Sequence, residues 1–105
     1  MGLDAIYGAL AHQVRRQLVA EIAPAPARVT DLAAGYPVSL AAVSKHIRVL
    51  EAAGLVRREV RGREHFLRLE AAPLAGAAAW LSDYRRFWEE RLDQLESRLR
   101  EPRER

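Results

Sequence analysis

The sequence predicts a mainly α-helical chain with one small β-hairpin, in the element order α-α-α-α-β-β-α and with a long last helix. Three observations predict this fold. A short helix, a turn and a capped helix follow one another over residues 30–53, a hairpin pattern follows at 55–69, and a near-heptad pattern covers 73–101. We expect the 105 residues, 1–105, to form a single domain.

Apolar residues that recur every three or four positions predict two helices near the N-terminus, with a kink near Ala11 and His12. Pro24 and Pro26 end the second helix, because proline cannot extend the hydrogen-bond ladder. The first set is Leu3, Ile6, Tyr7 and Leu10, and the second is Val14, Leu18 and Ile22.

The next two helices are marked by their caps. Thr30 before Asp31 is typical of an N-cap with an acidic first turn, and Gly35 to Pro37 ends this short helix. Ser39 is a second N-cap candidate, and Gly54 stands where a helix C′ residue is expected. The helix between them places one apolar set on one face, namely Leu40, Val43, Ile47 and Leu50.

Two β-favouring runs, Leu55–Val60 and Glu64–Leu69, flank a turn with Gly62 at its centre. Pro73 suits the first turn of the last helix, and Pro102 is expected to end it. That helix carries the apolar stripe Leu74, Leu81, Tyr84, Trp88, Leu92, Leu95 and Leu99. A helix-turn-helix followed directly by a hairpin is a winged helix-turn-helix.

Charge and composition narrow the class of function. The net charge of +3 arises in the middle of the chain, because residues 28–69 carry eight positive and four negative side chains. We expect this segment to contact a polyanion. The absence of cysteine excludes disulfides and thiolate metal sites. No apolar run could span a bilayer and no signal peptide is expected, so we expect a cytoplasmic protein. No arrangement of side chains suggests catalysis, and we expect no enzyme activity.

The helix at 39–53 has the properties of a helix that enters the major groove of DNA. Its back is apolar, its first turns are small or polar, and its N-terminus favours anions. Ala41, Lys45 and Arg48 are expected to point outward, with Ser44 and His46 at the flanks. The alternative is an ordinary amphipathic surface helix.

The basic hairpin favours the DNA-binding interpretation. Within the wing segment 57–68, four arginines surround the hairpin tip: Arg57, Arg58, Arg61 and Arg63. We expect Arg61 and Arg63 to contact phosphate or the minor groove. Alternatively, these arginines only protect an edge strand from aggregation. Arg15 and Arg16 are weaker phosphate candidates, for which ion pairs with nearby acids are the alternative.

Residues 41–56, AAVSKHIRVLEAAGLV, are similar to the AVSKHLKVLxEAGLV signature of the ArsR family of winged-helix repressors. Residues 11–16 resemble the family's ADPTRR opening, with departures at 12–14, and 61–69 resemble its wing. Residues 80–95 resemble the last helix of a subgroup without metal sites. The resemblance implies that six residues face DNA: Ser39, Leu40, Ala41, Ser44, Lys45 and His46. Leu40 departs from the glutamine of many relatives, and it could touch a thymine methyl group but not hydrogen-bond a base.

Metal-sensing members of that family use a Cys-x-Cys in the third helix or Asp, His and Glu in the last. Here Thr30–Tyr36 contains neither Cys nor His, the last helix contains no His, and His12, His46 and His65 are scattered without a spaced partner. We therefore expect no metal and no cofactor. The inducing signal stays open between an organic ligand, a partner protein and the protein's own concentration.

The last helix is more apolar than a small domain requires, which predicts a two-fold dimer built with the first helix. The expected dimer residues are Leu3, Tyr7, Trp80, Tyr84, Phe87, Trp88, Leu92 and Leu95. These aromatic side chains could instead form intramolecular core or line a small-molecule pocket.

The sequence thus predicts a sequence-specific transcriptional regulator. We expect a dimeric repressor that binds an inverted-repeat DNA operator through the helix at 39–53 and the wing at 57–68. The alternative function is a winged-helix module that binds another protein through its aromatic C-terminal helix.

Overall fold

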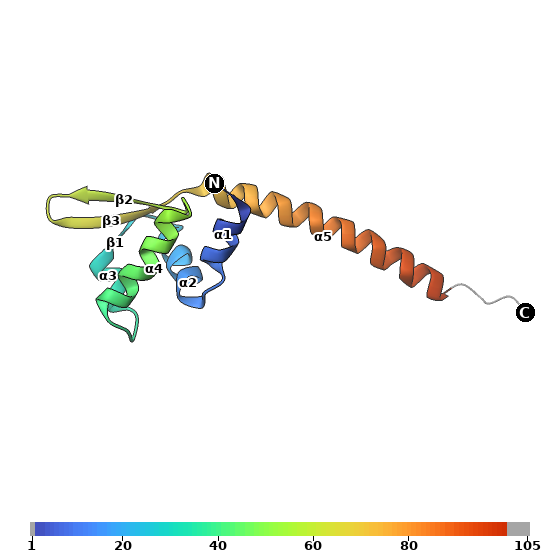
Figure 1. The fold of residues 1–105 in the computed structure, drawn as a ribbon, viewed down its shortest axis with the longest axis horizontal. Coiled ribbons are helices and arrows are strands. Elements are labelled where there is room, and N and C mark those ends of the chain that lie inside the picture. The colour runs from blue at the N-terminus through green and yellow to red at the C-terminus, as the bar shows by residue number, and fades with distance from the viewer. Residues whose placement is uncertain (1, 101–105) are drawn as a thin grey trace, which may run out of the picture.

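The computed structural model describes residues 2–100 of the chain. Within them, four helices and three strands form a compact body, from which a fifth and last helix projects (Figure 1). In chain order the elements are α1 (Leu3–Leu10), α2 (Gln13–Ile22), β1 (Ala27–Arg28), α3 (Val29–Ala34), α4 (Leu40–Ala52), β2 (Val56–Arg61), β3 (Glu64–Leu69) and α5 (Ala71–Arg100).

The core lies where helices α1 to α4 meet the sheet. Its largest fully buried side chains come from α2, α4, β3 and the segment after α4: Leu18, Ile22, Val43, Ile47, Leu50, Leu55 and Leu67. The predicted inward faces of α2 and α4 are therefore confirmed, with one exception. Leu40 is 53% exposed, so its placement with Val43, Ile47 and Leu50 on the buried face is wrong.

Side chains set the start of two helices. The break between α1 and α2 falls at the predicted place, because His12 caps α2 by accepting a hydrogen bond from the Val14 N–H on Nδ1, at 3.1 Å. Ser39 caps α4 as predicted, its hydroxyl accepting from the Ala42 N–H at 3.1 Å. Thr30 does not cap α3, since that helix begins at Val29.

The sheet has three strands in the order β1-β3-β2, all antiparallel. The two-residue strand β1 is absent from the predicted order, and it pairs Ala27 with Leu67 and Arg28 with Phe66. This pairing holds Arg28 extended just before α3, which explains why the helix begins one residue before Thr30. Gly54 and Gly62 have φ of 76° and 64°, a left-handed conformation that favours glycine at both predicted turns.

The last helix, α5, begins at Ala71, two residues before the predicted Pro73. Proline fits in this first turn because it has no N–H, and the N–H groups of a first turn have no partner within the helix. Thirty residues at about 1.5 Å each give α5 a length of about 45 Å, and the molecule is 78 Å long in total. Figure 1 shows most of α5 extending clear of the body. The predicted end at Pro102 lies outside the described residues. No helix within 2–100 is long and apolar enough to cross a membrane.

Candidate nucleic-acid interface

Helix α4 presents a small, cationic outer face. With Val43, Ile47 and Leu50 fully buried beneath it, the exposed side of the helix carries Ala41, Lys45 and Arg48. The half-buried side chains of Ser44 and His46 lie at its two flanks, as the helical spacing predicts. The N-terminus of α4 is exposed beside Ser39, so its free N–H groups face solvent where an anion could approach.

The wing, β2 and β3 with their turn, holds most of its arginines in ion pairs. These pairs are Arg57 with Glu70, Arg58 with Glu51, and Arg61 and Arg68 with Glu59. Arg28 of the neighbouring strand β1 pairs with Asp31 and with Glu64 of the wing. Glu51 belongs to α4, so its bidentate contact with Arg58, at 3.0 and 3.3 Å, also fastens the wing to that helix.

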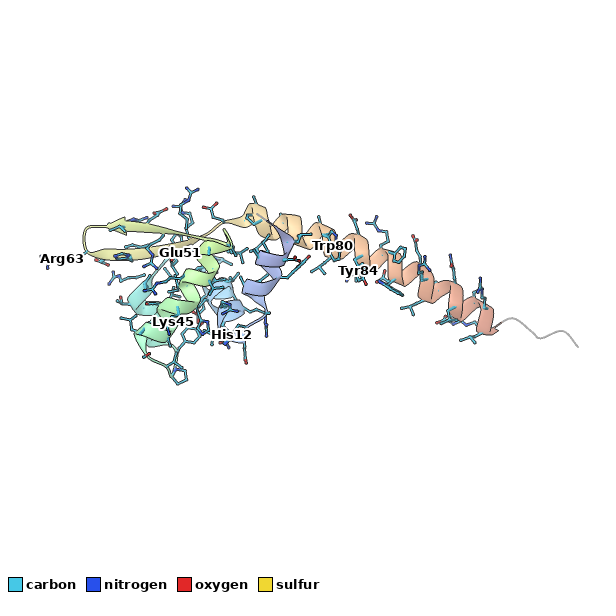
Figure 2. The ribbon with its side chains drawn as sticks, in the orientation of Figure 1. His12, Lys45, Glu51, Arg63, Trp80 and Tyr84 are labelled. Atoms are coloured by element: carbon cyan, nitrogen blue, oxygen red, sulfur yellow. The ribbon has the colours of Figure 1, made fainter. Side chains whose placement is uncertain are left out.

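Three cations of the 28–69 segment remain without an acidic partner among residues 2–100: Lys45, Arg48 and Arg63. All three are exposed. Figure 2 shows Arg63 at the tip of the wing and Lys45 on α4. The uncompensated positive charge of the segment is therefore concentrated on α4 and the wing tip.

Arg61 differs from Arg63 although both were predicted to contact DNA. Its guanidinium lies 3.1 Å from Glu59 and 4.7 Å from the ring centre of Phe66. The side chain of Arg61 is 58% exposed and can be reached by DNA, but an approaching phosphate would have to compete with Glu59 for it. Arg63 has no such competitor among the described residues and is the freer of the two.

A groove separates α4 from the wing. It has a volume of about 240 Å³, and Leu40 and Ser44 of α4 form one wall. The remaining lining comes from the start of α3 and from the wing: Arg28, Val29, Thr30, Arg58, Arg63, Glu64 and His65. A cationic groove beside an exposed helix N-terminus is suited to a nucleic-acid backbone.

Comparison with known proteins agrees with this geometry. Residues 10–59 match a helix-turn-helix domain family. The HTH-type transcriptional regulator Rv2034 of Mycobacterium tuberculosis is 39% identical over 85 residues, which are 81% of this chain and 77% of that protein. The crystal structure of the ArsR family transcriptional regulator RHA00566 has a TM-score of 0.76 and 33% identity, covering 83% of this chain and 90% of that one. The chain belongs to the ArsR family.

A further family structure, an ArsR-like transcriptional regulator from Rhodococcus sp. RHA1, has a TM-score of 0.74 and 32% identity over 90% of each chain. The winged helix-turn-helix fold predicted from the sequence is confirmed. This ArsR-family protein is a DNA-binding transcriptional regulator and not an enzyme.

Two histidines that are far apart in the sequence meet in this ArsR-family fold. The rings of His12 and His46 lie 4.3 Å apart between centres, and Arg15 donates to Nδ1 of His46 at 3.2 Å. The sequence spacing does not predict this pair, because only the fold brings the two rings together. Burial, followed by the positive charges of His12 and Arg15, lowers the pKa of His46. No group of three or more His, Cys, Asp or Glu within 2–100 is placed to hold a metal ion.

Arg15 and Arg16 occupy a role that the sequence did not suggest. Arg15 donates to the carbonyl oxygens of Ala9 and Gly8, at 2.6 and 3.3 Å, and Arg16 donates to that of Leu10 at 2.8 Å. Both guanidinium groups therefore cap the C-terminal end of α1, where the helix dipole favours positive charge. Neither pairs with an acid among residues 2–100, contrary to the ion-pair alternative.

Helix α5 carries a second surface, distant from α4 and the wing (Figure 1). Tyr7 of α1 donates to the carbonyl oxygen of Ala77 at 2.9 Å, and Leu3 and Tyr7 are half-buried against the core. Figure 2 shows Trp80 and Tyr84 beyond this contact, and their rings stack at 5.1 Å. From there the stripe is 45–74% exposed: Trp80, Leu81, Tyr84, Phe87, Trp88, Leu92, Leu95 and Leu99. Intramolecular core does not account for it.

Proposed function

We propose that this regulator represses transcription as a homodimer bound to an inverted repeat in DNA. In this proposal the chain works as one winged helix-turn-helix domain in the cytoplasm, in contact with the chromosome. Helix α4 enters the major groove, the wing contacts the backbone or minor groove, and α5 joins the two copies.

The observation that carries the DNA-facing assignment is the distribution of unpaired charge. Lys45, Arg48 and Arg63 are the cations of the 28–69 segment left without an acid among the described residues, and they lie along α4 and the wing tip. Phosphate contacts by such groups dominate affinity for DNA. The other proposed contacts are Ser39, Leu40, Ala41, Ser44, His46 and, after release from Glu59, Arg61.

The dimer assignment follows from the uncovered stripe of α5. Exposed aromatic and leucine side chains run from Trp80 to Leu99 along one face, and a large exposed apolar patch marks an interaction site. A second copy related by a two-fold axis covers such a face with the same face of its own. The homodimeric winged helix-turn-helix domain of Mb0332 from Mycobacterium bovis has this fold, with a TM-score of 0.62 and 22% identity over 87% of this chain and 82% of that one.

The test is a salt titration on selected DNA. Duplexes enriched from a random library by the purified protein are expected to contain an inverted repeat with half-sites about one helical turn apart. Affinity should fall steeply with salt, and Lys45→Ala and Arg63→Ala should each weaken binding and lower the slope of log K against log salt by about one.

Arg86→Ala is the matched control, since Arg86 is exposed on α5, away from the proposed DNA face. It should leave both affinity and slope unchanged. Enrichment of no common sequence, or equal slopes for Lys45→Ala, Arg63→Ala and the parent protein, would contradict the DNA-facing assignment. Binding of a protein partner through α5 would survive Lys45→Ala and Arg63→Ala, which separates that alternative from this one.

A further inference from the structure

Leu40 is an apolar side chain at the leading end of a DNA-facing helix. It is the first residue of α4, directly after the cap Ser39, and it is 53% exposed. The hydrogen bond from the Ala42 N–H to the Ser39 hydroxyl fixes the backbone at this point, so the direction of Leu40 is set. The other apolar residues at its spacing, Val43, Ile47 and Leu50, are fully buried. Leu40 therefore does not serve the core in the way its spacing predicts.

Leu40 is an aliphatic side chain in a groove lined mainly by polar and charged residues. It shares one wall of the groove between α4 and the wing with Ser44, and the lining opposite includes Arg58 and Arg63. The other aliphatic residue of this lining, Val29, is buried in the core. Leu40 is therefore the apolar contact that the groove offers, among groups that bind phosphate or donate hydrogen bonds.

The major groove of DNA presents one apolar group, the C5-methyl group of thymine. A leucine cannot form a hydrogen bond with a base edge, but it loses water-exposed apolar surface when it packs against a methyl group. We propose that Leu40 recognises the C5-methyl group of a thymine in each half-site. This inference rests on the proposed function, because it requires that α4 enter the major groove.

The size of the effect follows from the area that one methyl group buries. Removal of a single buried methyl group weakens binding about three- to fivefold. The effect should appear at one thymine position per half-site, and loss of the methyl group from other thymines should leave the affinity unchanged.

The test replaces each thymine of the selected site in turn by deoxyuridine, which removes the methyl group and keeps every hydrogen-bonding group. Fluorescence anisotropy then gives the dissociation constant of each duplex for the parent protein, for Leu40→Ala and for Val49→Ala. The parent should lose about three- to fivefold at one position. Leu40→Ala should bind the thymine and deoxyuridine duplexes equally at that position. Val49→Ala, which shortens another exposed apolar side chain of α4, should keep the parent's sensitivity.

A second arm tests whether Leu40 recognises the methyl group itself when a different base carries it. A duplex with cytosine at that position should bind less well than one with 5-methylcytosine, and the difference should vanish in Leu40→Ala. A site whose affinity is unchanged by deoxyuridine at every position would overturn the inference while leaving the proposed function intact. Sensitivity that persists in Leu40→Ala would overturn it too. Failure to enrich any site would overturn the proposed function and this inference together.

Discussion

Helices α4 and α5 both carry an apolar stripe, but only one of the stripes is covered by the chain itself. In α4 the inward residues Val43, Ile47 and Leu50 are fully buried, and the exposed side is short and cationic. In α5, among the described residues, only Ala77 is buried, and the stripe from Trp80 onward is about half exposed or more. The same helical periodicity therefore gives a core element in one place and an open surface in the other.

The difference shows that an apolar stripe identifies the face of a helix that needs to be covered, but not whether the same chain or another molecule covers it. Helix α4 lies between α2, α3 and β2, whereas α5 meets α1 near its beginning and then leaves the body. The stability of a single chain should therefore depend on α4, and the association of two chains on α5. Three predictions test this contrast, from the largest expected effect to the smallest.

Leu50→Ala in α4 should cause the largest loss of stability. Leu50 is 0% exposed, and truncation of a fully buried leucine costs about 2–5 kcal/mol. For a domain of this size that corresponds to a fall in Tm of about 10 °C or more. Thermal unfolding followed by circular dichroism measures it. Val49→Ala, on the exposed side of the same helix, should change Tm little, and a large loss there would contradict the burial pattern of α4.

Leu92→Ala in α5 makes the same chemical change at a side chain that is 59% exposed. It should leave the stability of a single chain almost unchanged but raise the dimer dissociation constant about tenfold, the effect expected of a contributing interface residue. Sedimentation velocity over a dilution series measures the dissociation constant. In the parent protein, Tm should also rise with protein concentration. An equally large, concentration-independent loss of stability in Leu92→Ala and Leu50→Ala would remove the contrast between the helices.

His46→Gln tests the polar flank of α4, with the smallest expected effect. Burial and the neighbouring cations hold the pKa of His46 below its usual 6.5, so below that pH the unfolded chain binds more protons than the folded one. The stability of the parent protein should therefore fall as the pH drops below about 6.5, and His46 should not reduce stability above that pH. His46→Gln should show a shallower loss of Tm between pH 7 and 5.5. An unchanged acid slope in the variant would mean that other groups cause it.

Much of the fold is predictable because it depends on local signals. The helix break near Ala11 and His12, the cap at Ser39 and the glycines Gly54 and Gly62 depend on only a few neighbouring residues, and the structure confirms all four. Strand β1 is different, because two residues are too few to show an alternating pattern and the strand exists through its pairing with β3. The wrong cap at Thr30 has the same origin, since β1 sets where α3 begins.

The site is less predictable because its chemistry depends on contacts between distant residues. The outward face of Ala41, Lys45 and Arg48 follows from helical geometry alone. A run of arginines does not reveal that Arg61 pairs with Glu59, nor that Arg63 has no acidic partner among residues 2–100. The meeting of His12 with His46 joins residues 34 positions apart, and it requires α2 and α4 to be packed together.

Side-chain hydrogen bonds join helix α1 to α5 on one side and to α4 on the other. Tyr7 binds the Ala77 carbonyl, and Arg15 binds the Ala9 carbonyl at one end and His46 at the other. In the proposed dimer these contacts would hold α4 in place relative to the start of α5, and we expect the two α4 helices to keep one separation. One inserted base pair turns the second half-site by about 34° around the DNA axis. In the proposed complex that torsion falls on the double helix, so we expect an operator with one inserted base pair to bind less tightly.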